Sequence, residues 1–231
     1  MTDQKKEAAR SAVTFITNNS TIGLGCGSTI QYMVNFLSEE IKNGLKLQLT
    51  TSSFTTHQLL LQKGLIVQPI FNFETIDIYF DGCDQFDKNL NALKSGGGIH
   101  TREKMLASMA NEFFLVGDET KYADSLDTKF PLVVEILPEA LRYAPAYLLK
   151  LFSAVKIAIR VSDKNDGPVI TANGNYLLDV WFTAWPDLKK LNESVKKITG
   201  VVETSLFCNL ANKAIIATRD KIKIVEKAVY Y

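Results

Sequence analysis

The sequence predicts an α/β protein with a doubly wound, mostly parallel sheet domain and a second, smaller α+β domain. Three observations carry this prediction. Short apolar runs alternate with amphipathic helical segments from residue 3 to residue 119, which is typical of a parallel sheet covered by helices on both faces. The order of elements changes near Pro131, and strand-like residues return after Gly200. The end of the chain is therefore expected to rejoin the first sheet.

The first half is predicted element by element from its periodicity. Residues 3–17 are expected to form a helix, because Ala9, Ala12 and Ile16 recur at helical spacing before a turn. Alternating or continuous apolar runs predict strands at 21–24, 45–49, 65–70, 76–81 and 113–119. Helices are predicted over 30–41, after the turn at 50–53, and over 101–112.

The second half predicts a different unit. A strand at 131–138, a helix at 139–153, a strand at 154–161, a hairpin at 168–182 and a helix at 188–198 follow one another. This β-α-β-β-α order is that of a ferredoxin-like domain. Strands at 213–218 and 221–225 then return to the first sheet. We therefore expect a discontinuous Rossmann-like catalytic domain of residues 1–126 and 204–231, and a ferredoxin-like domain of residues 127–203.

The composition excludes several classes of function. The 26 Lys and Arg residues nearly balance the 25 Asp and Glu residues, so neither a nucleic-acid partner nor a membrane surface is expected. No segment has the pattern of a signal peptide or a membrane span, and a cytoplasmic protein is expected. Cys26, Cys83 and Cys208 lie far apart with no histidine cluster, which predicts reduced thiols rather than disulfides or a zinc site.

Two turns between a strand and a helix carry polar residues. In "GLGCGST", three glycines precede Ser28 and Thr29, and free N–H groups at the helix start favour an anion such as a phosphate. The spacing matches neither the dinucleotide fingerprint nor a nucleotide P-loop. A tight turn whose helix is capped by Ser28 or Thr29 is the alternative. In "TTSSFTTHQL", helix capping by Ser52 or Ser53 is the expected use.

The segment "DGCDQFDKNLNALKSGGGIHTREK" contains acidic side chains, basic side chains and a glycine triplet within a short stretch. Asp81 and Asp84 follow a strand, where ligands bind in an open α/β sheet, and Lys94 precedes a glycine loop. Glu103 falls at the start of a helix, where the dipole is expected to keep it ionised. Each has a structural alternative, an Asp-Gly turn or a solvated helix start. Together they offer a base, proton shuttles and a positive charge without a metal, and the spacing is not that of a calcium loop.

These motifs resemble ribose-5-phosphate isomerase type A. The resemblance is carried, in family order, by "GLGCGST", "TTSSFTTHQL", "DGCDQFDKNLNALKSGGGIHTREK", "VGDETK", "PLVVEILP", "GPVITANGNYLLD" and "GVVETSLF", which cover nearly the whole chain. It implies an aldose–ketose isomerase of the pentose phosphate pathway, without metal or other cofactor, that interconverts ribose 5-phosphate and ribulose 5-phosphate through an enediol. It also implies a homodimer or a dimer of dimers.

The resemblance also assigns site residues. Glu103 would be the general base, and Asp81, Asp84 and Lys94 would hold the hydroxyls and the developing oxyanion, with Asp81 or Lys94 passing protons between the two oxygens. Lys5 would be a further contributor at the phosphate. The residues implied in substrate binding are Cys26, Gly27, Ser28, Thr29, Asp81, Gly82, Cys83, Asp84, Lys94, Ser95, Gly96, Gly97 and Lys121.

Five positions depart from the family pattern. Cys26 stands where Thr is usual, Cys83 where Ala is, Gln85 where Glu is, Ser95 where Gly is and Thr51 where Pro is. Cys26 is expected to weaken a hydroxyl contact while its N–H stays available to substrate. None of the five replaces a proposed proton-transfer group, so the changes bear on affinity more than on activity.

Two other classes of function are weighed against the isomerase. A sugar-phosphate sensor of this fold would carry a DNA-binding helix-turn-helix ahead of the domain, and the stretch before Gly23 is too short for one. A hexosamine-phosphate deaminase or a CoA transferase shares the broad fold but not the complete set of isomerase motifs.

Overall fold

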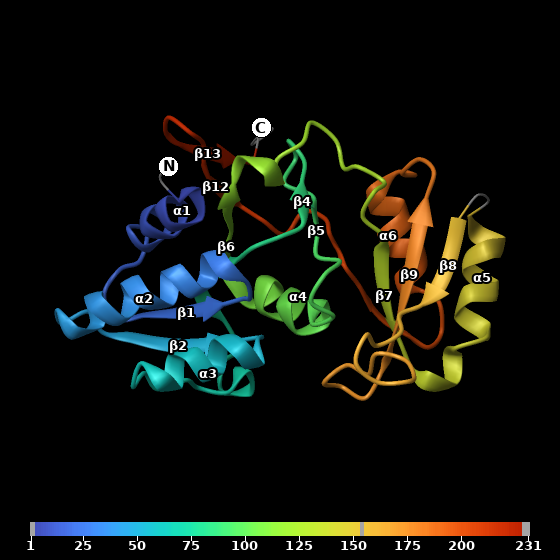
Figure 1. Ribbon diagram of the computed structural model, residues 1–231, viewed down its shortest axis with the longest axis horizontal. Coiled ribbons are helices and arrows are strands. Elements are labelled where there is room, and N and C mark those ends of the chain that lie inside the picture. Colours follow the sequence, from blue (N-terminus) through green and yellow to red (C-terminus); the bar gives the residue numbers. More distant parts are fainter. Residues whose placement is uncertain (1–2, 153–154, 228–231) are drawn as a thin grey trace.

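A computed structural model describes residues 3–152 and 155–227, and its largest sheet has six strands in the order β13-β12-β6-β3-β1-β2 (Figure 1). All neighbouring strands are parallel except the edge strand β13, which runs antiparallel to β12. The predicted parallel sheet and the return of the C-terminal segment to it are confirmed. The strands are β1 (Ser20–Leu24), β2 (Leu47–Thr51), β3 (Ile76–Asp81), β6 (Ala110–Asp118), β12 (Lys213–Ala217) and β13 (Ile222–Glu226).

Helices cover both faces of this sheet. Successive strand residues point to opposite faces, so Phe80 packs in the hydrophobic cluster under α1, α2 and α3, whereas Tyr79 packs in the cluster under α4. This is the doubly wound arrangement that the alternating pattern predicts. The helices are α1 (Gln4–Val13), α2 (Ser28–Lys42), α3 (Phe54–Gln62) and α4 (His100–Met109).

Three predicted elements of this part differ from the structure. The strand predicted at 65–70 is wrong: Val67 makes one isolated bridge to Leu49, and a 3-10 turn, η1 (Ile70–Asn72), follows Pro69. Proline has no N–H to donate to a ladder, which ends the pairing there. The helix predicted over 3–17 ends at Val13, and that over 101–112 ends at Met109, where β6 begins.

The second sheet has four antiparallel strands in the order β10-β7-β9-β8 and stands beside the first (Figure 1). This order confirms the smaller α+β unit with ferredoxin-like connectivity. The predicted hairpin is only partly regular, since residues before β9 contribute isolated bridges. The predicted helix end at 153 and strand start at 154 lie outside the described residues. The elements are β7 (Leu132–Ile136), η3 (Pro138–Ala140), α5 (Tyr143–Leu151), β8 (Val155–Ile159), β9 (Tyr176–Phe182), α6 (Leu188–Lys196) and β10 (Val201–Thr204).

A third, small sheet joins the other two. It consists of β4 (Gln85–Phe86), β5 (Ala92–Leu93) and β11 (Leu206–Phe207) in the order β11-β5-β4. Leu93 and Leu206 pack in the core of the four-stranded sheet, while Phe86 and Phe207 pack under the six-stranded one. The sequence did not predict this small sheet. Its strand β5 leads directly into the residues of the glycine loop.

Among the helices of the described ranges, none is long and apolar enough to span a membrane.

Candidate active site

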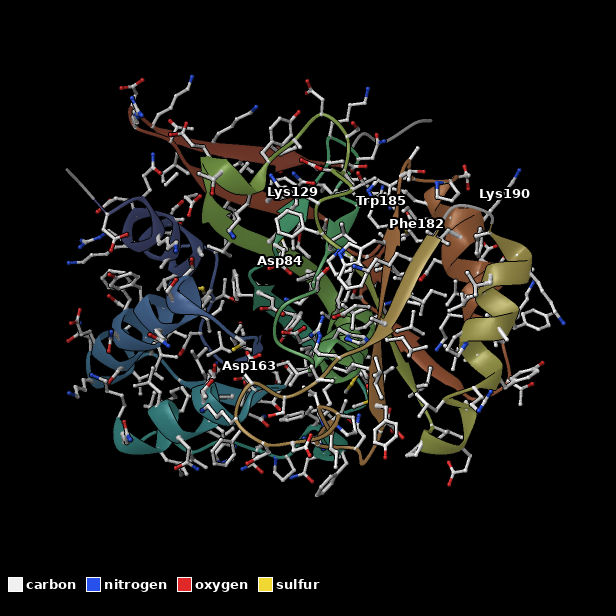
Figure 2. The ribbon with its side chains drawn as sticks, turned by 45° about the vertical axis from the view of Figure 1, so that its right-hand side comes forward. Asp84, Lys129, Asp163, Phe182, Trp185 and Lys190 are labelled. Atoms are coloured by element: carbon white, nitrogen blue, oxygen red, sulfur yellow. The ribbon has the colours of Figure 1, made fainter. Side chains whose placement is uncertain are left out.

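A cavity of about 230 Å³ opens at the carboxyl ends of the parallel strands. Its walls come from the turn after β1, the segment after β3, the glycine loop after β5, α4, the end of β6 and α1. Figure 2 labels Asp84 near the middle of the molecule, between the elements of the two larger sheets. The lining residues are Lys5, Cys26, Gly27, Ser28, Thr29, Gly82, Cys83, Asp84, Lys94, Gly96, Gly97, Glu103, Val116, Gly117 and Lys121.

The structure thus brings together nearly all of the residues implied for the site. Two of them, Asp81 and Ser95, are buried and do not line this cavity, although Ser95 lines a neighbouring hollow beside Asp84. Val116 and Gly117 line the cavity but were missed in the sequence. A glycine inside a strand marks a close approach of backbone or ligand, so Gly117 carried a signal that could have found it.

Asp81 ends β3 and is fully buried. Its Oδ1 accepts hydrogen bonds from the N–H groups of Cys26 at 3.1 Å and Gly82 at 2.8 Å, and its Oδ2 accepts one from the Tyr79 hydroxyl at 2.6 Å. A Cβ at Gly25 would lie 1.9 Å from the Asp81 carboxyl, so only glycine permits this approach. The expectation that the Cys26 N–H stays available to substrate is therefore wrong.

Lys94 is the buried cation of the site. Its Nζ lies 2.7 Å from Asp81 Oδ2 and 3.3 Å from Glu103 Oε1, and it donates to the carbonyl of Gly82 at 2.5 Å. Burial alone would lower the pKa of Lys94, but the neighbouring carboxylates of Asp81 and Glu103 outweigh it and raise that pKa above its ordinary value. Lys94 is therefore a permanent positive charge in the cavity wall.

Glu103 projects from the first turn of α4 and is 5% exposed. Burial raises the pKa of Glu103 to about 8; Lys94 opposes this shift and the charge of Asp81 adds to it. The expectation that the helix start keeps this carboxyl ionised is wrong, because desolvation of a buried carboxylate outweighs the helix dipole. A carboxyl with a pKa near neutrality can both accept and return a proton.

Asp84 is held by the glycine loop. Its Oδ2 accepts hydrogen bonds from the N–H groups of Ser95 at 2.5 Å and Gly96 at 3.0 Å. The Ser95 hydroxyl donates to the carbonyl of Pro131 at 2.6 Å. Ser95 thus holds Asp84 and the loop in place, and its assignment as a residue that contacts substrate stays a prediction.

The two hydroxyl-rich turns differ in the way their helices begin. Gly27 is the N-cap of α2, with φ of 109°, and no side chain caps that helix. Ser53 is the N-cap of α3, and its hydroxyl accepts a hydrogen bond from Thr56 N at 3.2 Å. The predicted cap at Ser53 is confirmed, and the one at Ser28 or Thr29 is wrong. The first residues of α2, Ser28 and Thr29, line the same cavity as Lys5 and Lys121, and no side chain caps the helix there, which makes this end suited to an anion.

The remaining titratable groups add little reactive chemistry. Burial raises the pKa of the Cys83 thiol to about 12, so this cysteine stays protonated at neutral pH and is a poor nucleophile. No group of three or more His, Cys, Asp or Glu side chains within residues 3–152 and 155–227 is placed to hold a metal ion.

Comparison with known proteins gives a consistent answer. The sequence profile of the family described as ribose 5-phosphate isomerase A (phosphoriboisomerase A) matches residues 48–221. Ribose-5-phosphate isomerase A of Pyrococcus abyssi is 35% identical over 227 residues, with 97% of this chain and 98% of that protein covered.

Solved structures agree with the sequence comparison. Ribose 5-phosphate isomerase A from Methanocaldococcus jannaschii is 33% identical, with a TM-score of 0.91 over 97% of this chain and 99% of that one. Ribose 5-phosphate isomerase from Plasmodium falciparum is 31% identical, with a TM-score of 0.90 and 98% of each chain covered. A D-ribose-5-phosphate isomerase in complex with phospho-erythronic acid is 34% identical, with a TM-score of 0.90 over 96% of this chain and 97% of that one. By sequence profile, by identity over nearly its whole length and by fold, the chain belongs to the ribose 5-phosphate isomerase A family.

Proposed function

We propose that the chain interconverts ribose 5-phosphate and ribulose 5-phosphate, through an enediolate formed in the 230 Å³ cavity. Membership of the family makes the chain an aldose–ketose isomerase, and the pentose phosphate pathway is the setting that the family implies. The observation that carries the proposal is the pair formed by Glu103 and Lys94, 3.3 Å apart in one cavity wall. A base beside a fixed cation is what proton abstraction next to a carbonyl requires.

Glu103 is the proposed general base. Its carboxylate takes the proton from C2 of the open-chain aldose and returns it to C1, so that the carbonyl moves from C1 to C2. A pKa raised by burial supports this role, because a base with a pKa near neutrality drives proton transfer in either direction.

Lys94 is the proposed partner of the substrate oxygens. As the negative charge of the enediolate develops, the Lys94 ammonium stabilises it from the cavity wall. Asp81 lies behind Lys94 and holds it in place. Lys94 stays charged and is therefore proposed to donate hydrogen bonds to both oxygens while a proton passes from the C2 oxygen to the C1 oxygen. Asp84 lines the cavity and is proposed to orient a sugar hydroxyl.

The phosphate is proposed to bind at the start of α2. Ser28 and Thr29 supply hydroxyls and N–H groups there, and Lys121 and Lys5 supply positive charge. A relative was solved in complex with phospho-erythronic acid, which supports a site that accepts a phosphorylated ligand. That ligand carries a phosphate at one end and, at the other, a planar anionic carboxylate similar in shape and charge to an enediolate.

Further proposals concern cofactors, location and organisation. Because Lys94 supplies the charge at the reacting oxygens, catalysis is proposed to need no metal or other cofactor. We further propose a cytoplasmic enzyme that forms a homodimer or a dimer of dimers. The division into residues 1–126 with 204–231 and residues 127–203 is also a proposal, which the separate hydrophobic clusters of the two larger sheets support.

The test is a direct assay. Purified protein is mixed with ribose 5-phosphate in EDTA, and ribulose 5-phosphate is followed over time. Product should form at the same rate with and without the chelator. No product under any condition would refute the proposed function, whereas activity lost in EDTA and restored by zinc, magnesium or manganese would refute metal independence alone.

A further inference from the structure

We propose that Arg160 is a positioning residue for Asp84, and that it acts through the peptide that joins Ser95 to Gly96. The inference rests on the proposed function, in which Asp84 contacts the substrate. It assigns the four-stranded sheet a part in catalysis, because Arg160 follows β8 of that sheet whereas Asp84 follows β3 of the large one.

Arg160 is fixed at both its backbone and its side chain. Its N–H donates to the carbonyl of Leu177 at 2.8 Å, and its carbonyl accepts from Val169 N at 2.8 Å. Its guanidinium meets the Asp179 carboxylate through Nε, at 3.1 Å from each oxygen, and through Nη2, at 2.5 Å from Oδ1. The side chains of this ion pair are only 19% and 15% exposed. A bidentate pair of this kind has well-defined geometry.

The remaining donors of the same guanidinium reach the glycine loop. Nη2 donates to the carbonyl of Ser95 at 2.8 Å, and Nη1 donates to the carbonyl of Gly96 at 3.2 Å. Arg160 therefore couples a rigid strand end to a loop whose own sequence, Gly96 to Gly98, permits many conformations. In Figure 2 Asp84 lies between the elements of the six-stranded and four-stranded sheets. The loop that carries Asp163, just after Arg160, extends toward the same region.

The peptide between Ser95 and Gly96 carries the effect to Asp84. Its carbonyl accepts a hydrogen bond from Arg160. Its N–H lies in the same plane, points in the opposite direction and donates to Asp84 Oδ2 at 3.0 Å. Because the peptide unit is planar and trans, holding the carbonyl also sets the direction of the N–H. A cation at the carbonyl end also polarises the peptide and strengthens the hydrogen bond at its other end.

Arginine suits this position better than lysine. A guanidinium has five N–H donors in a fixed fork, and here they serve one carboxylate and two carbonyls at once. An ammonium group can keep the charge but cannot hold all three partners in one plane. Arg160→Lys should therefore resemble Arg160→Met in activity more than it resembles the wild type.

The test is a double-mutant cycle between Arg160→Met and Asp84→Asn, measured as kcat/KM for ribose 5-phosphate. Arg160→Met alone should lower kcat/KM by about tenfold to a hundredfold, the usual cost of a small displacement of a catalytic group. In the Asp84→Asn background the same change should cost less than threefold, because the group that Arg160 positions has already been altered. Equal fold-losses in the two backgrounds would overturn the proposal.

A second readout covers the case in which turnover of Asp84→Asn is too slow to follow. The same cycle is then measured on the dissociation constant of phospho-erythronic acid by calorimetry, with the same criterion of non-additivity. If Arg160→Met does not fold, Asp179→Asn takes its place in the cycle. This variant keeps the shape of the Asp179 side chain but removes the charge that holds Arg160.

The matched control is Lys156→Met. Lys156 lies on β8 of the same sheet, and its Nζ stacks over the Trp181 ring at 5.4 Å. The variant removes a charge of the same sign from the strand that Arg160 follows, and it should leave kcat/KM unchanged. A loss equal to that of Arg160→Met would overturn the proposal. Inactive wild-type protein would instead refute the proposed function itself.

Discussion

Lys94 Nζ lies 2.7 Å from Asp81 Oδ2, and Asp81 has no exposed surface. This pair stands next to a second buried carboxyl, since Lys94 is also 3.3 Å from Glu103. One ammonium therefore serves two carboxyls in a place with little water. The raised pKa of Glu103 follows from this imbalance, because the desolvated site accommodates a second negative charge poorly.

The first prediction concerns removal of that ammonium. Lys94→Met leaves Asp81 buried without its cation, and loss of one partner of a buried pair costs about 3 to 5 kcal/mol. We therefore expect a large fall in the melting temperature at pH 8, together with loss of kcat. Lys129→Met, which breaks a pair whose side chains are 61% and 46% exposed, is the control and should change stability little. A Lys94→Met protein that is as stable as the control would contradict the account of this cluster.

The second prediction is a pH profile. Glu103 must be ionised to accept a proton, and its pKa is raised to about 8. kcat/KM should therefore rise with pH, with a midpoint near pH 8, and level off about one pH unit above it, since this parameter reports the pKa of the free enzyme. The charge of Asp84 contributes to the shift, so Asp84→Asn should move the midpoint to lower pH. A flat profile between pH 6 and 9 would show that Glu103 is not the titrating base.

The third prediction is the effect of Glu103→Gln on turnover. The amide keeps the shape of the side chain but cannot accept the proton, so kcat should fall by about 10² to 10⁴. This corresponds to a barrier increase of roughly 3 to 5 kcal/mol. Phospho-erythronic acid should still bind, because its phosphate is proposed to sit at the start of α2 rather than at Glu103. The control is Glu112→Gln, on β6 outside the cavity, and near-normal turnover of Glu103→Gln would exclude the assigned role.

The same variant has a predicted effect on stability. The folded protein raises the pKa of Glu103 from 4.5 to about 8, so it binds the proton more tightly than the unfolded chain does. The contribution of Glu103 to stability is therefore present below pH 4.5 and is lost as pH rises through 8. Glu103→Gln should lose less stability over this range than the wild type, as measured by urea unfolding at pH 5 and pH 8. A matched loss in both proteins would show that titration of Glu103 does not cause the pH dependence of stability.

Much of the fold could be predicted because local periodicity and burial agree. The strands of the large sheet, including β1 and β3, lie within or close to the predicted ranges. The strand predicted at 65–70 failed because apolar residues alone do not show whether a partner strand is available, and Pro69 removes a donor. The small sheet of β4, β5 and β11 escaped prediction because two-residue strands leave no periodic signal.

The site was predicted as a set of residues but not as a geometry. Resemblance named Asp81 and Ser95 as substrate contacts; the structure adds that both are bonded to other protein groups and that neither lines the 230 Å³ cavity. Burial also reversed the expected ionisation of Glu103, since desolvation depends on which segments cover a residue. Arg160, which is distant in sequence from the glycine loop, carried no local signal.

The last prediction compares two serines at helix starts. Ser28 begins α2 without capping it and lines the cavity, whereas Ser53 caps α3. Replacing Ser28 and Thr29 together by Ala should raise KM for ribose 5-phosphate far more than KM for unphosphorylated ribose, with little loss of stability. Ser53→Ala should do the reverse: it should cost about 1 kcal/mol of stability, the usual value of an N-cap, and leave KM unchanged. If the Ser28 and Thr29 double variant instead loses stability and affects both sugars equally, the turn after β1 is a structural element and the phosphate binds elsewhere in the cavity.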